Sequence, residues 1–266
     1  MPVYTSKTVL SRPLERTRYK NHIVYGGKPL SKKTAVALLV WQCFPARLNN
    51  SHTLRGAVLR FARTGYRASR EFLEKASEEV RPIHASGFFY VGLGYISYYL
   101  VFDYYDPLGY YDAIMRDQKL LEEEALRLQA SMQELIDKEE VIVNGVRVRP
   151  KVVLVDFGFH GSKKYPFIVF GVRFKAPIWV GRNVYENKYD KEKIEYNYEA
   201  YWIFPPGSRI LEVDMGPGNE DWEVVGKNIL AIYGRRGGFT GGYEKIVFNI
   251  GEELIYNRIV TKTNNT

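Results

Sequence analysis

Apolar positions in the first half of the chain recur with helical spacing in three segments. The first covers residues 31–43, and Pro45 would end it. The second covers residues 50–80, with Gly65 as a point where the helix bends or splits. The third covers residues 112–138, where apolar residues recur every seven positions as in a coiled-coil seam. The seam residues are Ile114, Leu121, Leu128 and Leu135, with Met132 in a companion position.

This heptad seam has two interpretations. In one, the helix packs on the protein's own sheet or on the helix of residues 50–80. In the other, the seam binds a helix of a second subunit, and the five seam residues form an interface. The sequence leaves both open.

Two further regions show the pattern of β-strands. Residues 87–111 are rich in Tyr and Phe, which favour strands, and Asp106–Gly109 is a turn sequence. Residues 141–148 predict a hairpin, because Asn144-Gly145 suits a type I′ turn. The charged segment 183–193 is predicted to be an exposed loop. Further strands are predicted at Val152–Phe157, Phe167–Phe174, Ile178–Val180, Tyr198–Phe204, Ile210–Met215, Trp222–Val225, Ile229–Tyr233, Lys245–Ile250 and Leu254–Val260.

The predicted fold class is therefore α+β. A helical N-terminal part and one long helix would pack with a mostly antiparallel β-sheet or sandwich in the C-terminal half, with a novel fold as one alternative. We expect a basic extended arm at 1–30, a helical and aromatic region at 31–140 and an all-β region at 141–266. Because the aromatic segment 88–111 is expected to join the C-terminal sheet, these regions would form one intertwined domain.

Residues 85–102 carry no charge, so a transmembrane helix has to be considered for this segment. Their length is at the lower limit for a transmembrane helix, but they contain several Tyr, Ser and Gly residues. A buried aromatic β segment is the expected structure. Residues 1–33 are polar and lack the apolar region of a signal peptide. We therefore expect no membrane partner, and a location in a virion or a host cytoplasm.

The charge is unevenly distributed. The formal net charge is +8, and by segment it is +11 for residues 1–81, −7 for residues 82–140 and +4 for residues 141–266. A basic end beside an acidic middle indicates a polyanionic partner, self-association or merely a solvated surface. Few Gln and many Lys, Glu and Tyr residues are typical of a thermostable protein.

No motif for catalysis or metal binding is visible. Cys43 lies in an apolar segment, so it is expected to be a buried thiol. None of the four histidines forms the i, i+4 pair with a helical Glu that binds zinc; they are His22, His52, His84 and His160. We expect no metal, no cofactor and no catalytic residue, and hence a protein that is not an enzyme. A pocket of converging carboxylates or histidines would instead favour an enzyme.

Two arginine-rich features are candidate nucleic-acid contacts. Four arginines lie on one stripe of the predicted second helix and could neutralise successive phosphates. The glycine-rich loop 234–243 adds two arginines and a phenylalanine that could stack on a base. Intramolecular ion pairs and an ordinary flexible loop are the alternatives. The candidate residues are Arg60, Arg63, Arg67, Arg70, Arg235, Arg236 and Phe239.

The Tyr-rich strand segment Tyr95–Tyr105, the abundant Lys and Glu and the single cysteine give the chain a distinctive style. In this style it resembles the orphan proteins encoded by viruses and mobile elements of hyperthermophilic archaea. The resemblance implies a non-enzymatic structural protein, such as a virion or assembly component that contacts copies of itself or other virion proteins. The alternative is a sequence-non-specific nucleic-acid-binding protein that uses the arginine stripe and the arginine-glycine loop.

Overall fold

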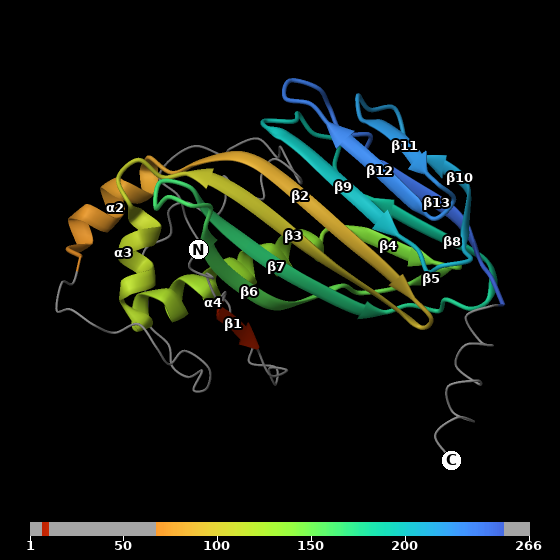
Figure 1. Cartoon of the computed structure of the whole chain (residues 1–266), viewed down its shortest axis with the longest axis horizontal. Coiled ribbons are helices and arrows are strands. Elements are labelled where there is room, and N and C mark those ends of the chain that lie inside the picture. The colour runs from red at the N-terminus through yellow and green to blue at the C-terminus, as the bar shows by residue number, and fades with distance from the viewer. Residues whose placement is uncertain (1–6, 11–67, 253–266) are drawn as a thin grey trace, which may run out of the picture.

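The computed structural model describes residues 7–10 and 68–252, and all structural statements concern these residues. Their strands form two sheets, of eight and five strands. Helices α2 (Arg70–Glu78) and α3 (Tyr110–Arg116) lie near one end of the larger sheet, and α4 (Gln118–Ile136) packs against it (Figure 1). The smaller sheet lies behind the other end of the larger sheet. The larger sheet therefore connects the helices with the smaller sheet (Figure 1).

The two sheets are named A and B. Sheet A contains, in spatial order, β1 (Lys7–Leu10), β6 (Lys151–Phe159), β7 (Pro166–Lys175), β3 (Tyr95–Tyr105), β2 (Arg81–Gly92), β9 (Asn197–Ile203), β12 (Ile229–Gly234) and β11 (Asp221–Val225). Sheet B contains β10 (Arg209–Asp214), β13 (Tyr243–Ile250), β8 (Gly181–Lys188), β4 (Glu140–Val143) and β5 (Val146–Arg147). All neighbouring strands are antiparallel except β2 and β9, which are parallel.

The predicted fold class is wrong. The described residues are mostly β, with only three short helices, rather than an α+β fold with a helical N-terminal part and one long helix. The first predicted helix and most of the second lie outside the described residues. The aromatic segment forms the β2–β3 hairpin between β7 and β9, so sheet A takes strands from both halves of the chain.

The helix predicted over residues 112–138 is two helices. Asp117 separates them, because its backbone is extended, with φ −108° and ψ 112°. Its side chain accepts hydrogen bonds from the backbone N–H groups of Lys119 and Leu120, at 2.9 and 3.3 Å. Asp is a favoured N-cap, so this residue begins α4 and ends the single long helix.

Most predicted strands of the C-terminal half match observed strands, with two differences, and the predicted strand Leu254–Val260 lies outside the described residues. Residues 178–180 are not a strand, and β8 occupies much of the segment predicted to be an exposed charged loop. β8 pairs with β13 on one side and with β4 on the other, so it is an interior strand of sheet B. Its alternate residues Asn183, Tyr185 and Asn187 are buried, and its charged residues take the opposite phase.

No helix among the described residues is long and apolar enough to cross a membrane. The uncharged segment of residues 85–102 runs along β2 and β3, where side chains alternate between the two faces of sheet A.

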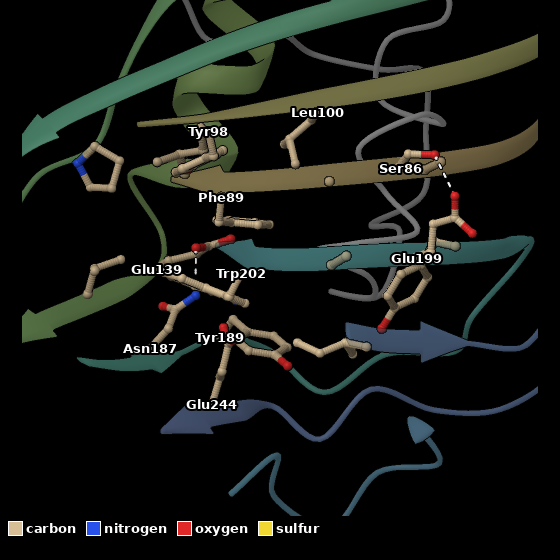
Figure 2. A pocket seen from close by; sticks show the side chains of 18 of the residues that line it. Ser86, Phe89, Tyr98, Leu100, Glu139, Asn187, Tyr189, Glu199, Trp202 and Glu244 are labelled. Carbon is tan, nitrogen blue, oxygen red and sulfur yellow. Dashed lines mark hydrogen bonds between the residues drawn. The ribbon is translucent and has the colours of Figure 1, made fainter. Parts of the chain in front are cut away.

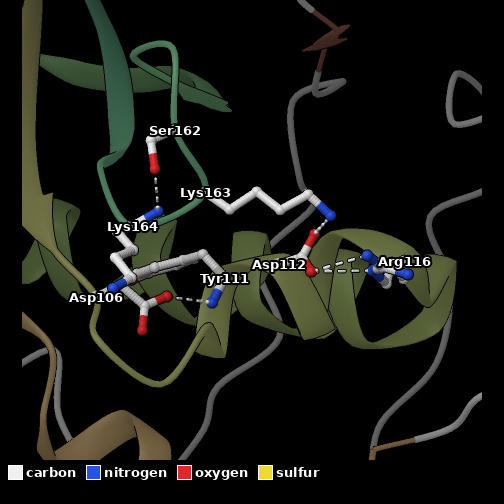
Figure 3. Close-up of polar contacts among 7 residues, drawn as sticks. All are labelled: Asp106, Tyr111, Asp112, Arg116, Ser162, Lys163 and Lys164. Carbon is white, nitrogen blue, oxygen red and sulfur yellow. Dashed lines mark hydrogen bonds and ion pairs between the residues drawn. The ribbon is translucent and has the colours of Figure 1, made fainter.

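Asp106 fixes the turn between β3 and α3. The residue is fully buried, and its carboxylate accepts hydrogen bonds from the backbone N–H groups of Gly109, Tyr110 and Tyr111 at 2.8–3.0 Å. Figure 3 shows the bond to Tyr111 and, beside it, Asp112 between Arg116 and Lys163. The Asp106 carboxylate thus satisfies three backbone donors at the start of α3.

We expect Asp106→Asn to lower the free energy of unfolding by about 2 kcal/mol, because an amide cannot accept all three hydrogen bonds. Asp112→Asn is the matched control. Its ion pairs are partly exposed, so its cost is expected to be below about 1 kcal/mol. Urea denaturation of both variants measures the difference. Equal effects would show that the buried turn is no more important than a surface ion pair.

Candidate ligand-binding cavity

A cavity of about 160 Å³ lies between sheet A, sheet B and the C-terminal end of α4, and it is partly open to solvent. On sheet A it lies over small side chains, because Gly87 of β2 pairs with Ala200 of β9 in register, and Ala85 lies two residues before Gly87. Alternate residues of a strand point to the same face, so these three positions leave one region of the sheet unfilled. The side chains of sheet B and α4, which face this region, do not fill it completely.

Aromatic rings form the walls of the cavity. Trp202 of β9 is 1% exposed and stacks on Phe89 of β2, with ring centroids 4.5 Å apart. Tyr185 of β8 contacts Trp202 from sheet B, also at 4.5 Å between centroids. Tyr98 of β3 stacks on Phe89 at 4.6 Å. Offset and tilted rings of this kind give a rigid apolar wall with polar hydroxyl groups at its edges.

Glu139 points into this cavity from the connection between α4 and β4 (Figure 2). Its Oε2 accepts a hydrogen bond from Asn187 Nδ2 of β8 at 3.0 Å. Burial of the carboxyl group raises the pKa of Glu139 to about 7, although the hydrogen bond from Asn187 lowers it in part. Desolvation therefore outweighs the one favourable contact, and the group exchanges its proton near neutral pH.

Glu244 of β13 is a second acid of the cavity and is buried, at 9% exposed, whereas Glu139 is partly exposed. Burial is the largest cause that raises the pKa of Glu244 to about 8, and the negative charges of Glu220 and Glu139 add to it. A hydrogen bond from Trp202 acts in the opposite direction. Within the described part of the chain, Oε1 of Glu244 and Oδ1 of Asn187 are buried without a hydrogen-bond partner.

Glu220 is a third acidic residue in the lining of the cavity. It precedes β11, receives a short hydrogen bond from the hydroxyl of Tyr198 and accepts the backbone N–H of Gly241 at 2.8 Å. Burial raises the pKa of Glu220 as well. The Tyr198 ring lies over Gly234 of β12, where a Cβ would approach it to 2.0 Å, so only glycine permits this arrangement.

The cavity therefore combines an apolar, aromatic wall with acidic groups, of which Glu139 and Glu244 lie near each other and Glu199 lies at the other end beside Ser86 (Figure 2). Among its described lining residues, four are glutamates and none is Lys, Arg or His. Carboxyl groups with raised pKa values in a pocket are a feature of functional sites, and this is the arrangement that would favour an enzyme. It can hold a small molecule, donate or accept protons near neutral pH and bind a positive charge.

These acids are not among the site residues predicted from the sequence, although the sequence contains a signal for them. Glu244 is in phase with Ile246, Phe248 and Ile250 along one strand, and all three are buried. Glu139 likewise precedes the buried Val141 by two residues. An acidic residue in the apolar phase of a strand is unusual, because an unpaired buried charge is costly.

The predicted interface residues are buried in the core of this chain. Their exposed fractions lie between 0 and 9%: Ile114, Leu121, Leu128, Met132 and Leu135. Helix α4 packs on β6, which corresponds to the intramolecular interpretation of the seam. Met132 and Leu135 also line the cavity. A subunit interface through this seam would require the core to open.

Of the predicted nucleic-acid contacts, Arg60, Arg63 and Arg67 lie outside the described residues. Arg70 begins α2 and pairs with Glu74, with 3.1 Å between Nε and Oε1. Arg235 pairs with Asp221 at 3.3 Å. Arg236 and Phe239 are exposed in the same loop between β12 and β13. The structure thus brings Arg235, Arg236 and Phe239 together on one loop and places Arg70 on a separate element.

Nucleic-acid binding by this loop stays a prediction. Reversing both charges with Arg235→Glu and Arg236→Glu is expected to weaken any binding to single-stranded DNA about tenfold at low salt, because phosphate contacts are lost. Fluorescence anisotropy against salt concentration measures the affinity, with Lys227→Glu in the turn at the other end of β12 as the control. Equal affinities of the three proteins would remove the loop from consideration.

Two histidines share one aspartate on the surface. His160 Nε2 lies 2.9 Å and His84 Nδ1 lies 3.5 Å from the carboxylate of Asp103. In residues 7–10 and 68–252, no three His, Cys, Asp or Glu side chains form a group that could hold a metal ion.

No protein-family model and no curated protein matches the sequence. Among solved structures, the chain is similar to yeast LTA4 hydrolase in complex with Bestatin, at 10% identity. The match covers 65% of this chain and 29% of the hydrolase, with a TM-score of 0.24. A similarity of this size says nothing about activity, so the function has to be argued from the cavity.

Proposed function

We propose that this protein binds a small, mainly apolar molecule in the cavity between its two sheets. The observation that carries the proposal is the combination of an aromatic wall around Trp202 with acidic groups and two buried oxygen atoms, of Glu244 and Asn187, that have no hydrogen-bond partner. Buried carboxyl groups are costly in a core that needs only packing. Their presence is explained if a ligand uses them. The volume suits about six non-hydrogen atoms, since a cavity of about 150 Å³ in another protein holds benzene.

Thermal unfolding with pentan-1-ol as the probe tests this proposal. We expect the alcohol to raise the melting temperature in a saturable manner, because a ligand that binds only the folded state stabilises it. Ala200→Leu, which fills the cavity from sheet A, should abolish the rise without unfolding the protein. Val225→Leu on the exposed strand β11 is the matched control and should keep it.

Two outcomes would contradict the proposal: a rise that does not saturate, or one that is equal in the natural protein and in Ala200→Leu. Mass spectrometry of the incubated sample adds a further distinction. Chemical conversion of a bound molecule would change the proposed class from a binding protein to an enzyme.

A second candidate function is the predicted role as a structural component of an assembly, and strand β11 favours it. β11 is the edge of sheet A, and among the described strands only β12 pairs with it. All five of its residues are exposed, including Trp222, Val224 and Val225. An exposed apolar edge strand is a template for pairing with another chain. We propose that copies of the chain associate through this edge.

Light scattering on a size-exclusion column tests the assembly. If the edge mediates it, Trp222→Lys and Val224→Lys together should convert an oligomer into a monomer, because charges on an edge strand oppose pairing. Leu211→Lys, on the exposed face of β10, is the control and should leave the mass unchanged. A natural protein that is already monomeric at high concentration would contradict this role.

A further inference from the structure

The chemistry of the cavity also indicates what kind of molecule it takes, an inference that builds on the proposed function. Two buried oxygen atoms in it have no hydrogen-bond partner in the described structure, Glu244 Oε1 and Asn187 Oδ1. Asn187 uses its Nδ2 group to donate to Glu139, which leaves its oxygen as an acceptor. Both free positions are thus available to accept a hydrogen bond, and a ligand that satisfies them must carry N–H or O–H donors.

The charges around these atoms restrict the donor further. Glu139, Glu244 and Glu220 come from three separate parts of the chain, and no cationic side chain is among the described lining residues. Burial opposes their ionisation, so the apo cavity retains protons that a cation could replace. Above these pKa values the acids are ionised and would repel a ligand with a carboxylate or phosphate.

Apart from Glu199, which accepts a hydrogen bond from Ser86, the remaining lining residues are apolar or neutral. Phe89, Trp202 and Tyr185 form one wall, and aromatic faces attract cations and alkyl chains alike. Four tyrosines lie near the acids, namely Tyr98, Tyr185, Tyr189 and Tyr198. The pKa values of all four are raised mainly by burial, so these tyrosines stay neutral at physiological pH.

We propose that the ligand is a small primary alkylammonium ion. Its ammonium group donates hydrogen bonds to Glu244 Oε1 and Asn187 Oδ1, with Glu139 as a further negative charge. Its alkyl chain lies against Phe89 and Trp202. A primary ammonium group has three donors and one positive charge, which matches the free acceptors and the acidic lining. The volume limits the chain to about five carbon atoms.

Isothermal titration at pH 8.5 with four probes of similar size tests this. We expect pentylamine to bind about tenfold or more tightly than pentan-1-ol, because only the amine brings a charge, and pentanoate to show no heat of binding. Tetramethylammonium carries the charge without N–H donors and should bind at least about tenfold more weakly than pentylamine. At pH 6 pentylamine should bind about tenfold more weakly, since the cavity acids are then protonated.

Two variants test whether the carboxylate of Glu244 binds the ammonium group. Glu244→Gln should weaken pentylamine about tenfold but leave pentan-1-ol within about twofold, which also shows that the cavity is intact. Glu223→Gln, on the exposed strand β11, is the control and should change neither. The ammonium proposal is wrong if pentan-1-ol, pentanoate or tetramethylammonium binds with the same affinity as pentylamine. The cavity proposal would still stand in that case. If none of the four probes binds, both are wrong.

Discussion

Between about pH 5 and pH 8, the free energy of unfolding is expected to fall as the pH rises, because two acids keep their protons in the folded state. Burial raises the pKa of Glu139 to about 7 and that of Glu244 to about 8, from an ordinary value of 4.5. In this window the folded state binds more protons than the unfolded state. The stabilisation is complete below the unfolded pKa and is lost as the pH passes the folded values.

The expected change is on the order of 3 kcal/mol for Glu139 alone, at about 1.4 kcal/mol per pKa unit. The double variant Glu139→Gln, Glu244→Gln removes both titrations, since an amide stays neutral. Relative to the natural protein it should be similar in stability near pH 5 and more stable near pH 8.5.

Denaturation at a series of pH values measures this difference, and Glu223→Gln is the control for removing an exposed acid. The difference in free energy of unfolding between the double variant and the natural protein does not contain the contribution of the other titrating groups, because both proteins share them. If the curves of the double variant and the natural protein stay parallel from pH 5 to pH 8.5, the two carboxyl groups are not held protonated by the fold.

Local features of the fold could be predicted from the sequence because short-range rules determine them. The turn Asn144-Gly145 has positive φ at both residues, 50° and 78°, as a type I′ turn requires. The strands β7, β9 and β12 follow apolar runs between turn residues. Asp117 divides the predicted long helix, and this too was accessible, because Asp followed by a helical pattern is an N-cap signal.

Features that depend on pairing between distant segments could not be predicted in this way. β8 has the composition of a loop, and it is a strand because β4 and β13 satisfy its backbone on both sides. The cavity needs the parallel pairing of β2 with β9, which places Gly87 beside Ala200. The heptad pattern of α4 does mark a buried face of this helix. The sequence pattern of such a face is the same whether a sheet or a second subunit covers it.

The proposed function therefore rests on Glu244, in the apolar phase of β13, and on Glu139, just before β4, rather than on the arginine stripe or the heptads. An acidic group at the position of Glu244 or Glu139 is costly for folding, whereas a buried apolar seam is an ordinary consequence of a core. This contrast is the reason why the cavity, rather than the surface, carries the proposed function.

Trp202→Ala is expected to be the most destabilising single substitution of the cavity wall, at about 3–5 kcal/mol. The side chain is 1% exposed and lies between Phe89 and Tyr185, so its removal loses apolar burial and ring contacts and enlarges an existing cavity. Trp222→Ala on strand β11 removes the same group from a position that is 45% exposed, and should cost below about 1 kcal/mol.

Urea denaturation at pH 6 compares the two tryptophan variants, and added indole shows where the lost stability lies. Because indole replaces the missing side chain, it should raise the melting temperature of Trp202→Ala in a saturable manner and leave Trp222→Ala unchanged. A variant too unstable to purify can be tested as Trp202→Phe, which keeps one ring and should lose about half as much stability. Equal destabilisation at positions 202 and 222 would show that Trp202 is not part of a packed wall, and the cavity would then lose the rigid surface on which ligand selection depends.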